Sequence, residues 1–187
     1  FLYDPESKRQ SSEWHTTESP RPEKARMSKS RITATLILFF DRKDAVHTEF
    51  VPQGQTANNE FYSEVLKRLR NRVRRIRKET RDNWILHHDN PSSHTALTVS
   101  ELLAKMGMAT LPQPSYSPDL APPDFFFFPR IKRTLKGTRN GTLETVKAAA
   151  TTSLKEVPVD GFQGAFSDLV KRWQQCVDAE GEYFEKF

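Results

Sequence analysis

The sequence predicts one α/β domain in which a mixed β-sheet is flanked by helices. Short apolar runs bounded by turn residues, typical of strands, occur among segments whose apolar residues recur every three or four positions, typical of helices. At 187 residues the chain is long enough for one domain with a core, and no internal repeat divides it. A mixed sheet with helices packed on it accounts for this order of elements best.

The opening residues are expected to form the end of a strand and then a long loop. Phe1–Tyr3 are apolar, and Asp4-Pro5 ends the strand by turn chemistry. Residues 5–31 are mostly Ser, Thr, Pro, Arg and Lys with little to bury, which predicts a long basic loop after the first strand.

A hairpin and a basic helix are expected next. Ile32–Phe40 and Val46–Val51 are apolar and β-branched, and the turn between them holds Asp41 and Asp44, which we expect to be solvated. The following segment has apolar residues at helical spacing, and Asn58 or Asn59 is expected to cap it. These inward-facing residues are Phe61, Val65, Leu66, Leu69, Val73 and Ile76.

Positive charge is concentrated on this helix. The chain has a net charge of +5 and a pI near 9.4, and the run from Lys67 to Lys78 contains no acidic residue. A polyanion such as DNA is therefore a plausible partner, although a solvated outer face is an equally good interpretation. The candidate DNA-binding residues are Lys67, Arg68, Arg72, Arg74, Arg75 and Lys78.

The second half is expected to contain two more short strands and several helices. Trp84–His88 and Ala109–Leu111 have the composition of strands. A helix capped by Ser93 is expected to run to about Met106, with Gly107 ending it. A proline-rich loop then leads to a helix that begins at Asp124 and ends near Lys136.

Two further helices complete the predicted domain. Their inward faces are formed by Leu143, Val146, Ala150 and Leu154, and by Phe162, Phe166, Leu169, Val170, Trp173 and Val177. The aromatic run Phe125–Phe128 is interpreted as core packing at a helix start.

Several classes of protein are disfavoured by composition. A single cysteine, Cys176, cannot form an internal disulfide, and no Cys/His pattern has zinc-site spacing. No apolar run approaches the roughly 20 residues that a membrane span requires, so no membrane partner is expected.

Two aspartates stand at the edges of predicted elements. Asp89 follows a strand and Asp124 begins a helix, and ligand sites in α/β folds favour such edges. Carboxylates that converge from separate elements can bind divalent cations for phosphoryl transfer, and their hard oxygen atoms suit Mg²⁺ or Mn²⁺. Taken alone, however, two such residues are more often solvated turn or capping aspartates.

Two longer motifs resemble those of mariner-type DNA transposases. They are His88–Thr95 (HDNPSSHT) and Tyr116–Asp124 (YSPDLAPPD). Asp89 and Asp124 have 34 residues between them, the spacing found in that family. The resemblance extends over almost the whole chain, through Tyr3-Asp4-Pro5, Trp14, Val51–Gly54, Arg172-Trp173, Cys176-Val177 and Tyr183-Phe184.

The resemblance implies an RNase H-like catalytic core that cuts transposon ends and joins them to TA target DNA. Three aspartates and two ions of Mg²⁺ or Mn²⁺ carry out this reaction, and Asp89 and Asp124 match the second and third aspartates. The first belongs to a Thr-Gly-Asp-Glu-like motif expected upstream of Phe1, so we expect residues 1–187 to form one catalytic domain without detectable cleavage activity. Residues 5–31 resemble a clamp loop between subunits, which implies a homodimer on DNA and nuclear localisation.

Some features depart from the family pattern or leave alternatives open. The family usually has Ala-Pro-Ser where this chain has Pro91-Ser92-Ser93, and the shifted proline favours a degenerate or domesticated DNA-binding and dimerisation module without catalysis. An RNase H-type RNA nuclease would use the same metals, but the second motif argues against it. Asn90 and His94 are secondary candidates, since His94 either faces the metal site or bonds to the backbone.

Overall fold

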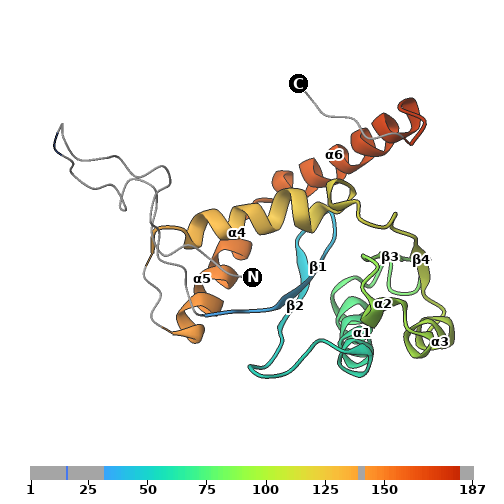
Figure 1. Cartoon of the computed structure of the whole chain (residues 1–187). Coiled ribbons are helices and arrows are strands. Elements are labelled where there is room, and N and C mark those ends of the chain that lie inside the picture. The colour runs from blue at the N-terminus through green and yellow to red at the C-terminus, as the bar shows by residue number, and fades with distance from the viewer. Residues whose placement is uncertain (1–15, 17–31, 139–141, 182–187) are drawn as a thin grey trace.

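The computed structural model describes residues 16, 32–138 and 142–181. The strand expected at Phe1–Tyr3 lies outside the described residues, as does the loop expected at residues 5–31 apart from Thr16. Helices surround two small sheets (Figure 1). The elements are β1 (Leu36–Phe40), β2 (Ala45–Phe50), α1 (Asn59–Ile76), β3 (Ile85–His87), α2 (Ser92–Thr95), α3 (Leu97–Lys105), β4 (Ala109–Leu111), a 3₁₀ turn (Pro118–Leu120), a π turn (Pro123–Phe127), α4 (Phe128–Leu135), α5 (Leu143–Lys155) and α6 (Val159–Asp178).

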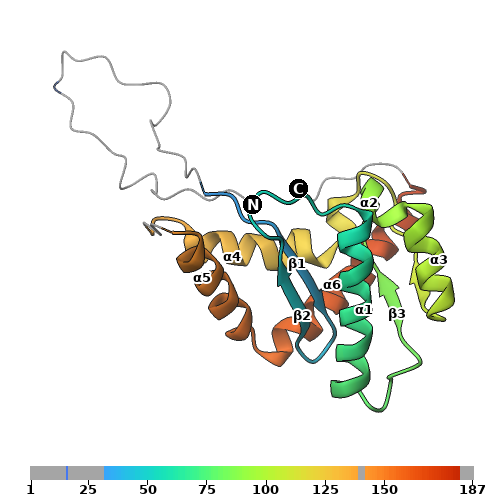
Figure 2. The same ribbon diagram turned by 90° about the horizontal axis from the view of Figure 1, so that it is seen from below.

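The β1–β2 hairpin lies between two layers of helices. Its strands pair antiparallel, and the predicted hairpin is confirmed with a shorter first strand. Leu36 and Leu38 point into a core formed with α4, α5 and α6, whereas Ile37 and Phe39 pack against the core on α1. Alternation along a strand sends successive side chains to opposite faces, so one hairpin serves both cores. Figure 2 shows β1 and β2 between α5 and α1.

The second sheet joins β3 and β4 in parallel. Ile85 pairs with Ala109 and His87 with Leu111. The α/β class is confirmed, but among the described residues the strands form two separate sheets and not one mixed sheet. Residues of β1 and β3 line a cavity of about 380 Å³.

Helix α1 begins where the sequence predicts, but its first buried residue is Tyr62 and not the predicted Phe61. The Asn58 side chain accepts a hydrogen bond of 2.9 Å from the N–H of Phe61, so Asn58 is the cap. Tyr62 is 1% exposed, while Phe61 is only half-buried, because the buried stripe starts one position later. Lys78 lies beyond the end of the helix.

The helix predicted from Ser93 to Met106 is instead two helices. Ala96 adopts an extended conformation, with φ −57° and ψ 143°, and separates α2 from α3. Both parts pack on α1: His94 on α2 stacks on Tyr62, and Val99 and Leu103 on α3 are buried in the core that contains Tyr62. Ser93 is not the cap, since α2 follows Pro91. Gly107 ends α3 with φ 64°, as predicted.

The C-terminal helices form the larger core. Phe127 is fully buried and its ring contacts those of Phe40, Phe126 and Phe162, which confirms the aromatic run as core packing. Val170 and Val177 were predicted to face inward but are 60% and 70% exposed. They lie seven residues apart on one face of α6, whereas Leu169 of the same helix is buried and Arg172 contacts Phe125. No helix in the described ranges is long and apolar enough to cross a membrane.

Candidate functional site

Asp89 and Asp124 line the same cavity. Asp89 lies two residues after the end of β3, and Asp124 lies in the π turn that precedes α4. The cavity lies between β1 and β3 and has a volume of about 380 Å³. Side chains from β1, β3, α2 and the π turn therefore meet there, as expected for two aspartates at the edges of separate elements.

Asp89 is held by His94. The Nδ1–H of His94 donates a hydrogen bond of 2.9 Å to Oδ1 of Asp89, and the His94 ring stacks on Tyr62 with centroids 3.6 Å apart. The hydrogen bond from His94 lowers the pKa of Asp89 below its ordinary value and outweighs the opposing effect of burial. The Asp89 carboxylate is consequently ionised and has a fixed orientation.

Tyr62 and His88 form a second layer behind this pair. The Tyr62 hydroxyl lies 2.9 Å from Nδ1 of His88. Burial, and then the neighbouring His94, lower the pKa of His88 to about 4, so its ring is neutral near pH 7. Burial and the charge of Asp89 raise the pKa of Tyr62, so the hydroxyl keeps its proton and donates to His88.

Gln113 connects the two motifs. Its Oε1 lies 2.6 Å from Nε2 of His87, and its Nε2 donates a hydrogen bond of 2.7 Å to the carbonyl of Ser117. Asn90 donates its side-chain N–H to the carbonyl of Gln113 and is absent from the cavity lining. Gln113 is 7% exposed, so this amide ties the end of β3 to the segment that leads to Asp124.

Asp124 has a different environment from Asp89. Burial, and then the charge of Asp89, raise the pKa of Asp124. The segment before it is anchored by Arg172 of α6, whose guanidinium lies 4.2 Å from the ring centroid of Phe125 and donates a hydrogen bond of 3.1 Å to the carbonyl of Asp119. The effect of Asp89 on the pKa of Asp124 indicates that the charges of the two carboxylates interact.

The pair fits a hard divalent cation. Burial and the charge of Asp89 make ionisation of Asp124 costly, and a divalent cation between the two carboxylates would offset that cost. Mg²⁺ commonly uses one or two protein carboxylates with water and phosphate oxygens. Within residues 32–138 and 142–181, no group of three or more His, Cys, Asp or Glu side chains has metal-site geometry. The described residues thus offer two carboxylates, Asp89 and Asp124, as ligands.

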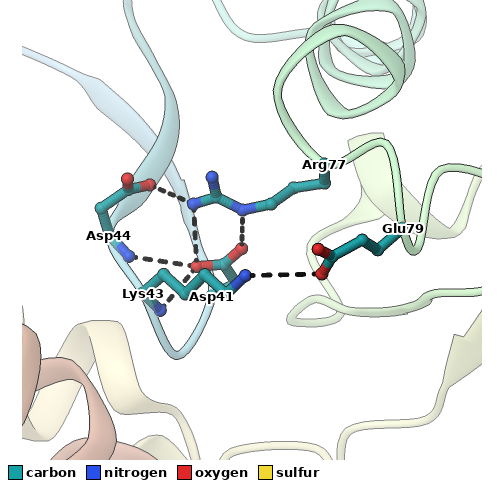
Figure 3. Close-up of polar contacts among 5 residues, drawn as sticks. All are labelled: Asp41, Lys43, Asp44, Arg77 and Glu79. Carbon is teal, nitrogen blue, oxygen red and sulfur yellow. Dashed lines mark hydrogen bonds and ion pairs between the residues drawn. The ribbon is translucent and has the colours of Figure 1, made fainter.

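The sequence analysis predicts that the two aspartates of the hairpin turn, Asp41 and Asp44, are solvated, but both are bound by Arg77. Arg77 donates hydrogen bonds of 2.6 Å to Asp41 and 2.5 Å to Asp44, and Lys43 lies 3.8 Å from Glu79 (Figure 3). Burial alone would raise the pKa of Asp41, but hydrogen bonds from Arg77 and from two backbone N–H groups together keep this pKa below its ordinary value. This cluster fastens the hairpin to the end of α1.

The six candidate DNA-binding residues divide into two groups. Three are held in ion pairs: Lys67 with Glu64 at 2.6 Å, Arg68 with Glu49 at 2.7 Å and Arg74 with Asp82 at 2.7 Å. Arg72, Arg75 and Lys78 are exposed and make no ion pair with any described residue. The structural partners of the first group come from outside the basic run, which is why the run itself did not reveal them.

Sequence reasoning missed Tyr62 and Gln113. Both are buried polar residues whose partners are distant in the sequence, at separations of 26 for Tyr62–His88 and for Gln113–His87. Tyr62 has the helical spacing of a core residue, and Gln113 lies among prolines, so neither carries a local signal of a role at the site.

Known proteins resemble this chain in sequence and structure. Residues 4–83 match the family model described as a transposase with a partial DDE domain. The mariner Mos1 transposase of Drosophila mauritiana is 29% identical over 169 residues, which are 89% of this chain and 49% of that protein. The chain therefore spans about half the length of this relative.

Solved structures of Mos1 transposase are also similar to this chain. A Mos1 transposase catalytic domain with raltegravir and Mg has a TM-score of 0.76 and 30% identity, covering 81% of this chain and 77% of that one. A Mos1 paired-end complex with the left transposon end has a TM-score of 0.82 and 28% identity, covering 99% of this chain and 53% of that one.

Proposed function

Because this chain belongs to the mariner transposases and has the RNase H-like α/β fold of their catalytic domain, we propose that, as part of the complete protein, it cuts transposon-end DNA and joins the ends to target DNA. We treat residues 1–187 as one catalytic domain. The observation that carries the proposal is that Asp89 and Asp124, from separate elements, line one cavity, where burial and then the charge of Asp89 raise the pKa of Asp124.

We assign Asp89 and Asp124 as ligands of Mg²⁺ or Mn²⁺. The solved relative with Mg supports this choice, as do the hard oxygen donors. When bound, such ions activate the attacking oxygen and stabilise the leaving oxygen in phosphoryl transfer. A third carboxylate and a second ion, as expected from the family, would complete the site.

Neighbouring residues position the ligands. His94 holds Asp89 through its Nδ1–H and is itself held flat against Tyr62, so it is a positioning residue. Gln113 keeps the end of β3 at a fixed place relative to the segment before Asp124. We propose that Asn90 is also a positioning residue. Its side-chain amide donates to the backbone carbonyl of Gln113, and Asn90 does not line the cavity.

DNA is the proposed partner. We propose that it is bound by exposed cations, which are Arg72 and Arg75 on α1 and Lys78 just after the end of this helix. The relative solved with a transposon end supports this partner. We further propose a homodimer on DNA, nuclear localisation and TA target sites, in line with the family resemblance.

A degenerate DNA-binding module is the second candidate. It is favoured by Pro91, which directly precedes α2 and leaves that helix without a side-chain cap beside Asp89. The two candidates differ in their need for Asp89 and Asp124, because a module without catalysis loses nothing when either carboxylate is neutralised.

The test is cleavage by the complete protein of a supercoiled plasmid carrying the DNA that flanks its own coding sequence, in Mg²⁺ or Mn²⁺. Asp89→Asn and Asp124→Asn are each expected to reduce cleavage by at least about 10²–10³-fold, with DNA binding retained. Cleavage that persists in either variant contradicts the assignment. Absence of cleavage in the unaltered protein, with DNA binding intact, favours the module.

A further inference from the structure

A second cavity lies against the outer strand of the hairpin. It has a volume of about 850 Å³ and is lined by residues of α1, β2 and α5. Its lining shares only Val46 with that of the cavity that holds the two aspartates. Figures 1 and 2 show α1 and α5 on either side of β2, so this space is a groove between two helices, which we call the basic groove.

Cations from both helices converge on the basic groove. Arg68, Arg72 and Arg75 line it from α1, at positions i, i+4 and i+7 of one helical stripe, and Lys155 lines it from the last turn of α5. Arg68 is bound to Glu49 of β2. Arg72, Arg75 and Lys155 are exposed and form no ion pair within the described part of the chain.

The negative charge in the lining is already neutralised. Asp44 is the acidic residue of the lining, and Arg77 contacts it at 2.5 Å from outside the groove. Asn71, on the same face of α1, has a side-chain amide without a hydrogen-bond partner among the described residues. The groove therefore presents a surplus of donors and positive charge, which suits an anionic ligand.

The geometry suits a chain of phosphates better than a single anion. Arg72 and Arg75 lie about 4.5 Å apart along α1, given a rise of roughly 1.5 Å per residue. One DNA strand carries a phosphate about every 3.4 Å of helix axis, so the two arginines are spaced for neighbouring phosphates.

We propose that the basic groove binds the sugar–phosphate backbone of DNA at a place separate from the two aspartates, with Arg72, Arg75 and Lys155 as the phosphate contacts. This inference rests on the proposed function and deepens it. It adds α5 to the DNA surface through Lys155. It also removes Lys67 and Arg74, which line no part of the groove and are held by Glu64 and Asp82.

The test compares two variants that lose the same charge. The groove variant carries Arg72→Gln, Arg75→Gln and Lys155→Gln, and the matched control carries Lys67→Gln, Arg74→Gln and Arg81→Gln, three cations held in ion pairs outside the groove. Fluorescence anisotropy with a short labelled duplex is measured in EDTA between about 50 and 200 mM salt, and circular dichroism verifies that both variants are folded. EDTA keeps the metal site out of the measurement.

We expect the slope of log affinity against log salt to become shallower by about 2–3 in the groove variant and by less than about 1 in the control. Equal changes in the two variants would overturn the groove as the DNA site while leaving the proposed function intact. If the unaltered protein binds no DNA at any salt, the DNA partner itself fails.

The alternative occupant of the basic groove is an acidic peptide, which would pair with the edge of β2 that is not paired with β1. Polyglutamate serves as the probe, titrated against the same two variants. Loss of polyglutamate binding in the groove variant, with an unchanged DNA salt slope, would overturn the proposal in favour of a protein ligand. Displacement of polyglutamate by DNA at the unaltered groove, with the expected slopes, supports it.

Discussion

Asp89 and Asp124 line one cavity, but the parts of the molecule that hold them differ in kind. Asp89 follows a three-residue strand and is oriented by side-chain hydrogen bonds and ring stacking through His94 and Tyr62. Asp124 lies in the π turn before α4, and this turn is held by the buried ring of Phe127 among other aromatic rings. The pKa of Asp89 is lowered and that of Asp124 is raised. Polar contacts thus set the charge and orientation of one proposed ligand, while packing sets the place of the other.

The largest effect on stability is expected on the Asp124 side. Phe127→Ala removes a fully buried ring that contacts Phe40 and Phe162, and it leaves a cavity in the larger core. We expect a loss of about 3–5 kcal/mol in the free energy of unfolding, measured by urea denaturation. Phe125→Ala, at a half-buried neighbour, is the control and should lose much less. Equal losses would contradict the idea that core packing at Phe127 places this ligand.

A functional effect with little loss of stability is expected on the Asp89 side. His94→Ala removes the donor that orients Asp89, and second-layer partners of this kind change metal affinity by about 10–100-fold. Mn²⁺ affinity can be measured by electron paramagnetic resonance of the free ion. Tyr62→Phe, which keeps the stacked ring and loses only the hydroxyl contact with His88, should change this affinity by less than His94→Ala does. A weaker effect of His94→Ala would show that Asp89 needs no side-chain support.

A smaller effect is expected where the hairpin is fastened to α1. Asp41 has a lowered pKa in the folded protein, so its contribution to stability is present above the unfolded pKa and is lost as pH falls through the folded pKa. Arg77→Gln should therefore destabilise the protein by about 1–3 kcal/mol near pH 7 and by progressively less below about pH 4. Denaturation midpoints at several pH values provide the measurement. A difference that stays constant with pH would exclude the ion pair as its cause. Arg81→Gln, at an exposed pair, is the control.

Much of the fold followed from local patterns in the sequence. The hairpin, α1 and its Asn58 cap, the parallel strands and the three C-terminal helices arise from apolar periodicity and from turn residues, and such signals lie within a few positions of the element they determine. The break at Ala96 and the exposure of Val170 and Val177 did not follow, because they depend on which neighbours the helix meets. Periodicity identifies a face but does not say where the core ends.

The candidate site was predictable only in part. Asp89 and Asp124 were found from their positions beside turns and from motifs, and their shared cavity is as expected. Tyr62 and Gln113 were not found, because their partners are brought close only by the tertiary fold. The basic run predicted a DNA-binding face. The acidic residues that form ion pairs with Lys67, Arg68 and Arg74 lie outside this run. Sequence alone could therefore not separate free cations from paired ones.

The claim that Asp89 and Asp124 share one divalent cation is tested most directly by a double-mutant cycle on Mn²⁺ affinity, with Asp89→Asn, Asp124→Asn and the double variant. If both carboxylates bind the same ion, each single substitution should weaken binding at least about 10-fold, and the double variant should bind scarcely more weakly than either single variant. A single variant that still binds one Mn²⁺ ion with unchanged affinity would place the two carboxylates in independent sites and contradict the account.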